Sequence, residues 1–335
     1  MTTPGPESSA PPSSGSSNST PTGNTNVAPS EPNTNNPQEP VVSKPEFLFA
    51  TIPGAQSILS FQTQNPTPGT TLPAKAITGI QGFLGEALAY DAVTDRLYAS
   101  TGPNILVFDK ASTLSGVAQP SRTIQTSGTG IMNFSNIVLD RAADTLFLAG
   151  SAQYQDVLAI IGNASTASGA VAPDHTYAIA SGSRGFAVDT KRKLLYGLGS
   201  TVGVFVFDLT ALQELTGPVS TINQATRVMV IPEFSNMTGV AIDQERDRLY
   251  IAGFGKLAVV ETASTAKANV AYQSFTISAH STTFDAAHDR LYVGAINSAY
   301  IINDASALKN GSAIPATVVV GNPQNNYYVG GFAFP

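Results

Sequence analysis

The chain has 335 residues, no cysteine and a formal net charge of −6, and only 12% of its residues are charged. The lack of cysteine excludes disulfides, thiolate zinc sites and cysteine nucleophiles within this sequence. No basic stripe or basic-aromatic cluster occurs, which argues against nucleic acid as a partner. No stretch approaches the roughly 18 apolar residues of a membrane helix, so we expect no transmembrane segment.

Residues 1–45 consist mainly of Ser, Thr, Pro, Asn and Gly and contain no aromatic residue. Such a segment cannot bury enough apolar surface to offset the entropy that is lost on ordering. We therefore predict a disordered tether over 1–45 and one folded domain over 46–335. Met1 leads directly into TTPGPESSA, without the basic start and apolar core of a signal peptide.

Tethers of this composition commonly precede the folded domains of exported bacterial lipoproteins and wall-associated proteins. We expect a mature exported protein of the bacterial cell envelope or periplasm, attached through an N-terminal lipid anchor that is absent from this chain. A cytoplasmic protein is the alternative, because a lack of cysteine does not decide the compartment.

A short phrase recurs five times in the folded part, with Asp followed six residues later by Leu and an aromatic residue. Its copies are Asp91–Tyr98, Asp140–Phe147, Asp189–Tyr196, Asp243–Tyr250 and Asp285–Tyr292. Their first residues lie 49, 49, 54 and 42 positions apart. A period of about 40–50 residues with strand-like content is typical of propeller blades.

Each unit reads as four short strands, of which the second is the Leu-aromatic strand of the phrase. The first strands are predicted at Ala87–Tyr90, Ile137–Leu139, Phe186–Val188, Val240–Ile242 and Thr282–Phe284. The third are predicted at Ile105–Asp109, Val157–Ile161, Val204–Asp208, Leu257–Glu261 and Ala299–Asn303. Fourth strands are predicted at Ser121–Gln125, Arg227–Ile231, Gln273–Ile277 and Ala316–Val320. No window has a sustained helical period, so almost no helix is expected.

The two ends of the repeat region complement each other. Glu46–Gln62 reads as the second and third strands of a blade without its first strand. Gly330–Pro335 (GGFAFP) reads as an isolated first strand and aligns with Gly185–Asp189. We therefore predict an all-β, six-bladed β-propeller in which the C-terminal strand becomes the innermost strand of the N-terminal blade. This closure pairs edges that would otherwise be open to association.

Three segments of the repeat read GVAID at Gly239–Asp243, LYIA at Leu249–Ala252 and VFVFD at Val204–Asp208. They resemble the NHL-type and YVTN-type propeller repeats, and the resemblance extends over about residues 46–335. It implies the propeller fold. The resemblance does not decide the function, because these repeats occur in scaffolds, binding proteins and a minority of enzymes.

The repeated aspartates are expected to be structural, since a residue needed for a reaction appears once and a residue needed for a blade appears in each. Asp at this position can accept backbone N–H bonds and cap the turn into the next strand. We expect Arg96, Arg248 and Arg290 to pair with acidic neighbours along the same turn.

Residues that do not recur are the candidates for function. Five positions before each aspartate the inner strand enters the axial channel, where propellers usually bind ligands. These positions hold Glu86, Ser135, Arg184, Thr238 and His280, with Gly330 in the composite blade. Together with Asn136 at the next position, Glu86, Arg184 and His280 are predicted to form a polar site at the channel mouth. A solvated mouth with assorted polar residues is the alternative.

Two functions remain open. The first is a non-catalytic binding or scaffold module that presents a propeller face to a protein or saccharide partner. For this role Tyr327 and Tyr328, within QNNYY, suit protein or carbohydrate contact, although they could instead pack the closing blade.

The second is a divalent-metal-dependent hydrolase or lactonase with its site in the channel. Six-bladed lactonases hold a divalent metal there through Glu, Asn and Asp oxygens, which are ligands that suit Ca²⁺. Glu86 and Asn136 are the candidate ligands here, and Asn133 or Asn236 could join them. A second channel carboxylate is not evident, and His280 as a general base would need a partner within hydrogen-bond reach.

Overall fold

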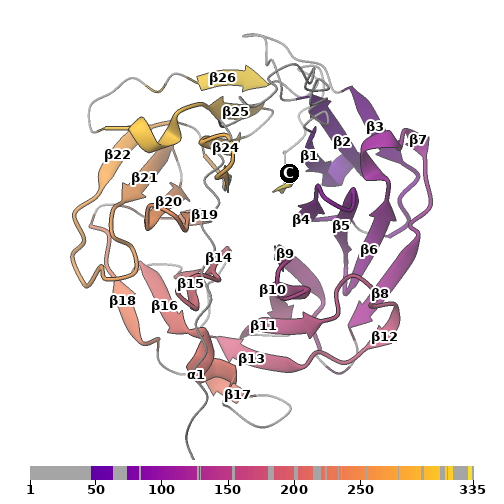
Figure 1. Cartoon of the computed structure of the whole chain (residues 1–335), viewed down its shortest axis with the longest axis horizontal. Coiled ribbons are helices and arrows are strands. Elements are labelled where there is room, and N and C mark those ends of the chain that lie inside the picture. Colours follow the sequence, from indigo (N-terminus) through magenta and orange to yellow (C-terminus); the bar gives the residue numbers. More distant parts are fainter. Residues whose placement is uncertain are drawn as a thin grey trace, which may run out of the picture. The chain divides into compact units, whose positions relative to one another are not determined.

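A computed structural model describes residues 47–333, except for the segments 63–73, 83, 127, 129, 153–154, 180–184, 200–202, 214–219, 223–224, 233, 235, 254, 278, 296–297, 310–313, 315 and 320–330. All described residues belong to one compact unit, Lys44–Pro335. Within it the strands form six sheets placed around a common axis (Figure 1). The six-bladed β-propeller expected from the repeat is thereby confirmed.

The blades are numbered here in chain order. Blade 1 consists of β27 (Phe332–Ala333), β1 (Phe47–Ile52), β2 (Ser57–Gln62) and β3 (Lys75–Thr78). Blade 2 consists of β4 (Leu84–Asp91), β5 (Arg96–Thr101), β6 (Asn104–Asp109) and β8 (Arg122–Thr126). Blade 3 consists of β9 (Asn133–Asp140), β10 (Thr145–Ala152), β11 (Gln155–Gly162) and β13 (His175–Ile179).

The second half of the ring repeats this arrangement. Blade 4 consists of β14 (Phe186–Asp189), β15 (Leu194–Leu198), β16 (Val204–Asp208) and β18 (Arg227–Met229). Blade 5 consists of β19 (Met237–Asp243), β20 (Arg248–Gly253), β21 (Lys256–Val260) and β22 (Gln273–Thr276). Blade 6 consists of β23 (Ser281–Asp285), β24 (Arg290–Ala295), β25 (Ser298–Ile302) and β26 (Ala316–Val319).

Helix is scarce, as expected. The described residues contain one α-helix, α1 (Leu209–Gln213), and three single 3₁₀ turns, η1 (Pro53–Ala55), η2 (Ala111–Thr113) and η3 (Ala305–Ala307). No helix among them is long and apolar enough to cross a membrane.

Three outer strands were not anticipated from the sequence. Strands β7 (Gly116–Val117), β12 (Gly169–Val171) and β17 (Ser220–Ile222) each leave their own blade and pair in parallel with the outermost strand of the preceding blade. They cover the open edges of blades 1, 2 and 3, which would otherwise present unpaired backbone groups.

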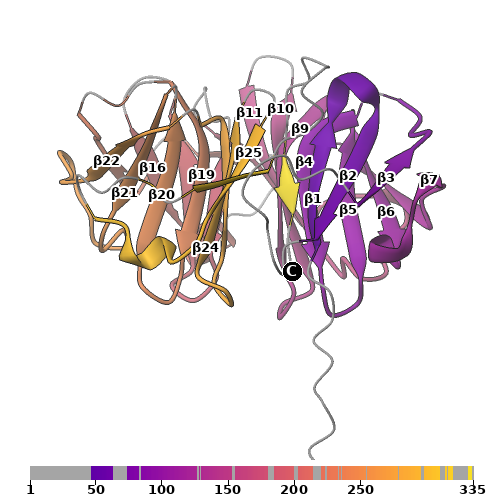
Figure 2. The ribbon, with the colours of Figure 1, turned by 90° about the horizontal axis from the view of Figure 1, so that it is seen from above.

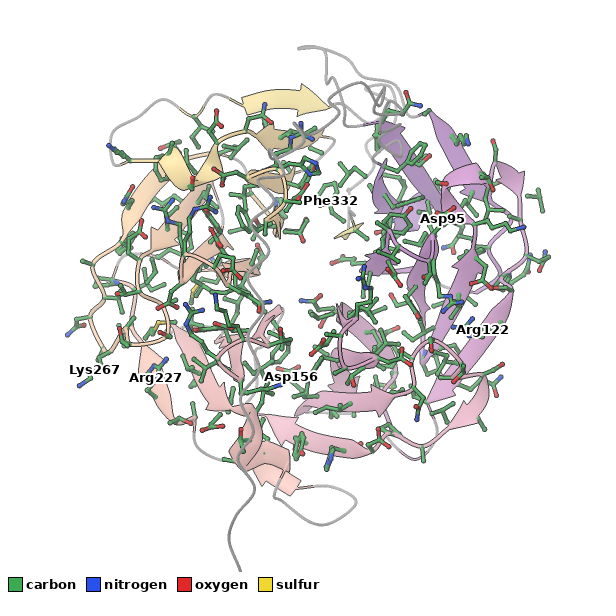
Figure 3. The ribbon with its side chains drawn as sticks, in the orientation of Figure 1. Asp95, Arg122, Asp156, Arg227, Lys267 and Phe332 are labelled. Atoms are coloured by element: carbon green, nitrogen blue, oxygen red, sulfur yellow. The ribbon has the colours of Figure 1, made fainter. Side chains whose placement is uncertain are left out.

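The ring closes through its C-terminal strand, as the sequence predicts. In β27, Ala333 pairs with Phe49 and Phe332 with Ala50, and Gly331 O accepts from Thr51 N at 3.1 Å. Gly331 N donates to Thr51 Oγ1 at 2.9 Å. Phe332 is buried in the cluster between blades 6 and 1, and Figure 3 labels it on the inner side of the ring.

The core lies in the spaces between neighbouring blades, which are filled by aromatic and branched side chains. The aromatic residue of the repeated phrase is buried there in all five copies, as Tyr98, Phe147, Tyr196, Tyr250 and Tyr292. Burial raises the pKa of Tyr250 to about 12, because the phenolate would lose its hydration. The phrase therefore recurs because its aromatic residue fills the interface between blades at five of the six places around the ring.

Each repeated aspartate caps the turn between the first and second strands, which confirms its structural role. Asp243 is fully buried, and its Oδ1 accepts from Glu245 N at 3.0 Å and Arg246 N at 3.1 Å. Its Oδ2 lies 2.9 Å from Arg246 Nη1. Asp189, also fully buried, is held in the same way by Arg192. We call the edge of the ring that carries these turns the turn face; the coiled ribbons of η2 and η3 lie along it in Figure 2.

A second aspartate, four residues later, ties the turn to the end of the third strand. Asp95 accepts from Ser112 N at 2.9 Å and from Ser112 Oγ at 2.8 Å. The same pair of hydrogen bonds joins Asp144 to Ser165, Asp247 to Ser264 and Asp289 to Ser306. All four aspartates have a left-handed backbone, which Asp tolerates better than most residues.

The expected pairing of the repeat arginines along the turn is wrong for Arg96 and Arg248. Arg96 Nε lies 2.6 Å from Asp109 Oδ1, and Arg248 Nη2 lies 2.6 Å from Glu261 Oε1. Both partners belong to the end of the third strand, because the hairpin register places Arg96 directly opposite Asp109. Arg290 Nε donates to Asn303 Oδ1, at the corresponding place in blade 6.

Candidate functional site: the channel mouth

The inner strands of the six blades enclose a cavity of about 280 Å³. One of its ends, opposite the turn face, lies where these strands begin, and we call it the channel mouth. Residues that line the cavity there include Glu86, Ser135, Asn136, Thr238, His280 and Ser281. Counting back from the repeated aspartate thus brings Glu86, Asn136 and His280 to one cavity. Arg184, Tyr327 and Tyr328 lie outside the described residues, and their roles stay predictions.

Three β-bulges lie at the mouth. The pairing register shifts between Leu84 and Leu88 in blade 2, next to Gly150 in blade 3, and between Met237 and Gly239 in blade 5. Bulges re-aim side chains and are common beside functional sites. They leave Glu86, Ser135 and Thr238 without a partner in the pairing register, so each of these blades presents a mouth residue outside the regular ladder.

Glycines let the inner strands approach each other at the mouth. A Cβ on Gly239 would lie 2.8 Å from Ser281 Cα, and a Cβ on Gly331 would lie 1.6 Å from Glu86 O. Any side chain at either position would therefore force neighbouring backbones apart. These two glycines explain how blades 5 and 6, and blades 1 and 2, meet around the cavity.

Asn136 connects two blades. Its Nδ2 donates to Phe186 O in blade 4 at 2.6 Å, so the amide group holds two inner strands together. This bond uses one of the two N–H groups of the amide, so the second N–H and the carbonyl oxygen Oδ1 retain hydrogen-bonding capacity. Asn136 therefore combines a structural bond between blades with a place in the lining of the cavity.

His280 is half-buried just before β23, and its backbone N donates to Gly294 O at 2.7 Å. Burial lowers the pKa of its imidazole, because the cation would lose hydration. The imidazole of His280 therefore binds a proton more readily in the unfolded state than in the folded state. The contribution of the neutral ring to the free energy of unfolding is present above about pH 6.5, and it is lost as the pH falls through the lower pKa of the folded state.

We expect an NMR titration of the folded protein to place the His280 midpoint below 6.5. His280→Gln should flatten the loss of stability between about pH 6.5 and 5, relative to the unchanged protein. A midpoint at or above the ordinary histidine value would contradict the burial of this ring.

The inner strand of blade 6 is polar where the others are apolar. Its residues Ser281, Thr282 and Thr283 take the place of Gly239, Val240 and Ala241 in blade 5. The hydroxyl oxygens of Ser281, Thr282 and Thr238 are buried and have no hydrogen-bond partner among the described residues. Buried hydroxyls are normally satisfied, so this side of the mouth has unused capacity for water or a polar group. The run STTFD is the sequence signal by which this feature could have been found.

The Ca²⁺ site considered at Glu86 and Asn136 does not fit the described residues well. Asn133 and Asn236 are exposed and are not among the residues that line the cavity. Asn133 is the first residue of β9 and Asn236 precedes β19, so both lie before the bulge of their blade. Within the described part of the chain, no group of three or more His, Asp or Glu side chains is placed to bind a metal. Ca²⁺ takes about six to eight oxygen ligands, and we derive no reaction through a metal.

Comparison with known proteins shows the fold. No protein-family model and no curated protein matches the chain. A solved propeller chain of the nidogen/laminin complex is similar over 86% of this chain and 98% of its own length, with 14% identity and a TM-score of 0.58. Hydrazine synthase from Kuenenia stuttgartiensis (77% and 73% covered) has 14% identity and a TM-score of 0.52.

A third similar structure is a functionally unknown protein from Desulfotomaculum acetoxidans. It has 11% identity and a TM-score of 0.52, and the match covers 77% of this chain and 75% of that one. Identities this low support the propeller architecture and leave the NHL-type or YVTN-type assignment as a resemblance.

Proposed function

We propose that this protein is a non-catalytic binding module of the bacterial cell envelope, and that its channel mouth contacts a partner protein. One observation carries the proposal. The charged residues that recur from blade to blade are used in bonds within and between blades, whereas residues that differ between blades gather at the mouth. Irregular residues on a rigid scaffold are where recognition usually resides.

The chemistry of the mouth suits recognition. Glu86 is exposed, His280 is half-buried, and the unpartnered hydroxyls of Ser281, Thr282 and Thr238 lie on the blade 5 and blade 6 side. A few convergent polar groups over an apolar cavity wall fix the orientation of a bound group. The polar composition of residues 1–45 supports a spacer between the propeller and the envelope.

A protein is favoured over a saccharide as the partner. The similar nidogen/laminin structure is a complex of two proteins, and the match covers 98% of the propeller chain found there. At 14% identity this likeness concerns the scaffold, so the choice of partner class has to be tested on this chain.

The test is quantitative capture from extracts of the producing cells, using the purified chain and a mouth variant with Glu86→Gln, Ser135→Ala and His280→Ala. We expect the mouth variant to lose at least about tenfold in affinity for the captured protein, since anchors at an interface centre dominate binding energy. Lys267→Ala is the matched control, because Lys267 is exposed and lies on the outer rim in Figure 3. Equal capture by the mouth variant and the control would overturn the proposal.

A glycan array with the same proteins covers the saccharide alternative. Binding of a defined glycan that is lost in the mouth variant would keep the site and replace the partner class. Turnover of lactones or esters that needs Glu86 would instead favour the hydrolase considered from the sequence.

A further inference from the structure

The turn of blade 4 departs from the other four complete turns. Between the repeated aspartate and the Leu-aromatic strand it reads TKRKL, whereas the others read AVTDR, RAADT, QERDR and AAHDR. Three consecutive cations, Lys191, Arg192 and Lys193, therefore stand on the turn face of a chain whose net charge is −6. Lys193 occupies the position at which the other four turns carry the second aspartate.

Lys193 is poorly suited to that position. Its φ is 56°, in the left-handed region that Asp tolerates better than Lys. A lysine also cannot accept the two hydrogen bonds that Asp95 and its equivalents receive from a serine. In blade 4 the acceptor at this place is Asp208, whose Oδ1 accepts from Thr210 N at 2.8 Å. A position that breaks the rule of its own repeat without a structural gain points to a function.

The neighbouring cations differ in how far they are already used. Arg192 lies 2.9 Å from Asp189 and 3.8 Å from Asp247, so its charge is held by buried and half-buried carboxylates. Lys191 Nζ lies 2.7 Å from Glu245 Oε2, with both side chains exposed. Lys193 is exposed and has no ion pair within the described part of the chain. It is the cation of this turn that remains for a partner.

The turn of blade 5 completes the surface. Thr190 Oγ1 bonds with Gln244 Oε1 at 3.0 Å and Arg192 Nη1 donates to Gln244 O at 2.6 Å, so the two turns are in contact. Arg246 follows on the blade 5 turn and keeps 45% of its side chain exposed. The result is a basic surface, Lys191–Lys193 with Arg246, which we call the blade 4 basic turn.

We propose that the blade 4 basic turn is a docking site for an acidic, carboxylate-rich segment of a protein. Glu245 already places a carboxylate on Lys191, which shows that the surface accepts this group. The negative charge of Glu245 disfavours polyphosphates. Arg192 and Arg246 already form ion pairs with Asp189 and Asp243, which leaves less positive charge for such a ligand. Because the turn face lies at the opposite ends of the inner strands from the channel mouth, this site is independent of the proposed function and would let one chain bridge two partners.

The probe is a fluorescein-labelled decaglutamate peptide, followed by anisotropy at about 20 mM and 150 mM salt, where screening differs strongly. We expect Lys193→Asp to weaken binding at least about fivefold at low salt, since it reverses the free charge of the site. Lys193→Asp restores the residue of the other four turns, so its melting temperature should equal or exceed that of the unchanged chain.

Lys110→Asp is the matched control. Lys110 is exposed, has a φ of 54°, and lies beside η2 on the turn face of blade 2, so the same charge change occurs in the same backbone conformation. Binding of the peptide by Lys110→Asp should equal that of the unchanged chain. Equal loss in both variants would mean attraction by net charge alone, and no loss in either would exclude the site. Tighter binding of inorganic phosphate or anionic vesicles than of the peptide would also overturn the proposal.

Discussion

Replacing Asp243 by alanine is expected to lower the free energy of unfolding by about 2–4 kcal/mol. Asp243 is fully buried and accepts the N–H groups of Glu245 and Arg246. Without the carboxylate these two donors would lose their acceptor at a position that is fully buried in the folded chain. Each buried donor left unsatisfied costs about 1–3 kcal/mol.

Asp140→Ala is the control for this prediction, because it removes the same residue of the repeat from a different environment. Asp140 is only partly buried and accepts from Ala143 N at 3.0 Å, so water can replace it. Its loss should stay within about 1 kcal/mol. Urea unfolding measures the free energy of unfolding of both variants, provided that its slope m against urea concentration is unchanged. Equal losses in the two variants would show that burial of the aspartate does not determine its role.

Replacing Gly331 by alanine is expected to open the ring. The added Cβ would lie 1.6 Å from Glu86 O and 2.8 Å from Glu86 C, which are backbone atoms that cannot rotate away. The strand β27 would have to leave its place, and with it the burial of Phe332 and the pairing to β1. We expect a loss of about 3–5 kcal/mol, similar to the removal of a buried Phe side chain.

An open ring would also expose the inner edge of β1, which favours association between chains. Gly185→Ala is the matched control, since Gly185 aligns with Gly331 but its nearest atom, Leu198 Cδ1, would lie 3.3 Å from the new Cβ. Thermal melts and light scattering after gel filtration check both variants. A monomeric Gly331→Ala that is as stable as Gly185→Ala would contradict closure by the C-terminal strand.

The blades could be predicted because their spacing depends on residues that every blade needs. Asp243 and its equivalents cap a turn, and Tyr250 and its equivalents fill the space between blades, so both recur at a regular interval. Strands β7 and β12 could not be predicted, because two or three residues carry no periodicity and their pairing depends on the preceding blade. The salt bridge of Arg96 with Asp109 was missed because it follows from hairpin register, which sequence spacing alone does not reveal.

The sequence predicts which positions form the candidate site, but it does not predict the geometry of the site. Counting back from the repeated aspartate places Glu86 and His280 at one level of the ring and Asn136 at the next. The bulges in blades 2, 3 and 5 depend on how each hairpin twists, and the bond from Asn136 to Phe186 O joins two blades. The left-handed backbone of Lys193 likewise becomes visible only when the turn is built.

The most direct test of the central claim places a photoreactive residue at position 86 of the otherwise unchanged chain, with position 267 on the outer rim as the comparison. After irradiation in extracts of the producing cells, binding through the channel mouth predicts a discrete protein adduct from position 86 and none from position 267. Adducts of equal yield at both positions, or none at position 86 while capture by the chain persists, would contradict recognition at the mouth.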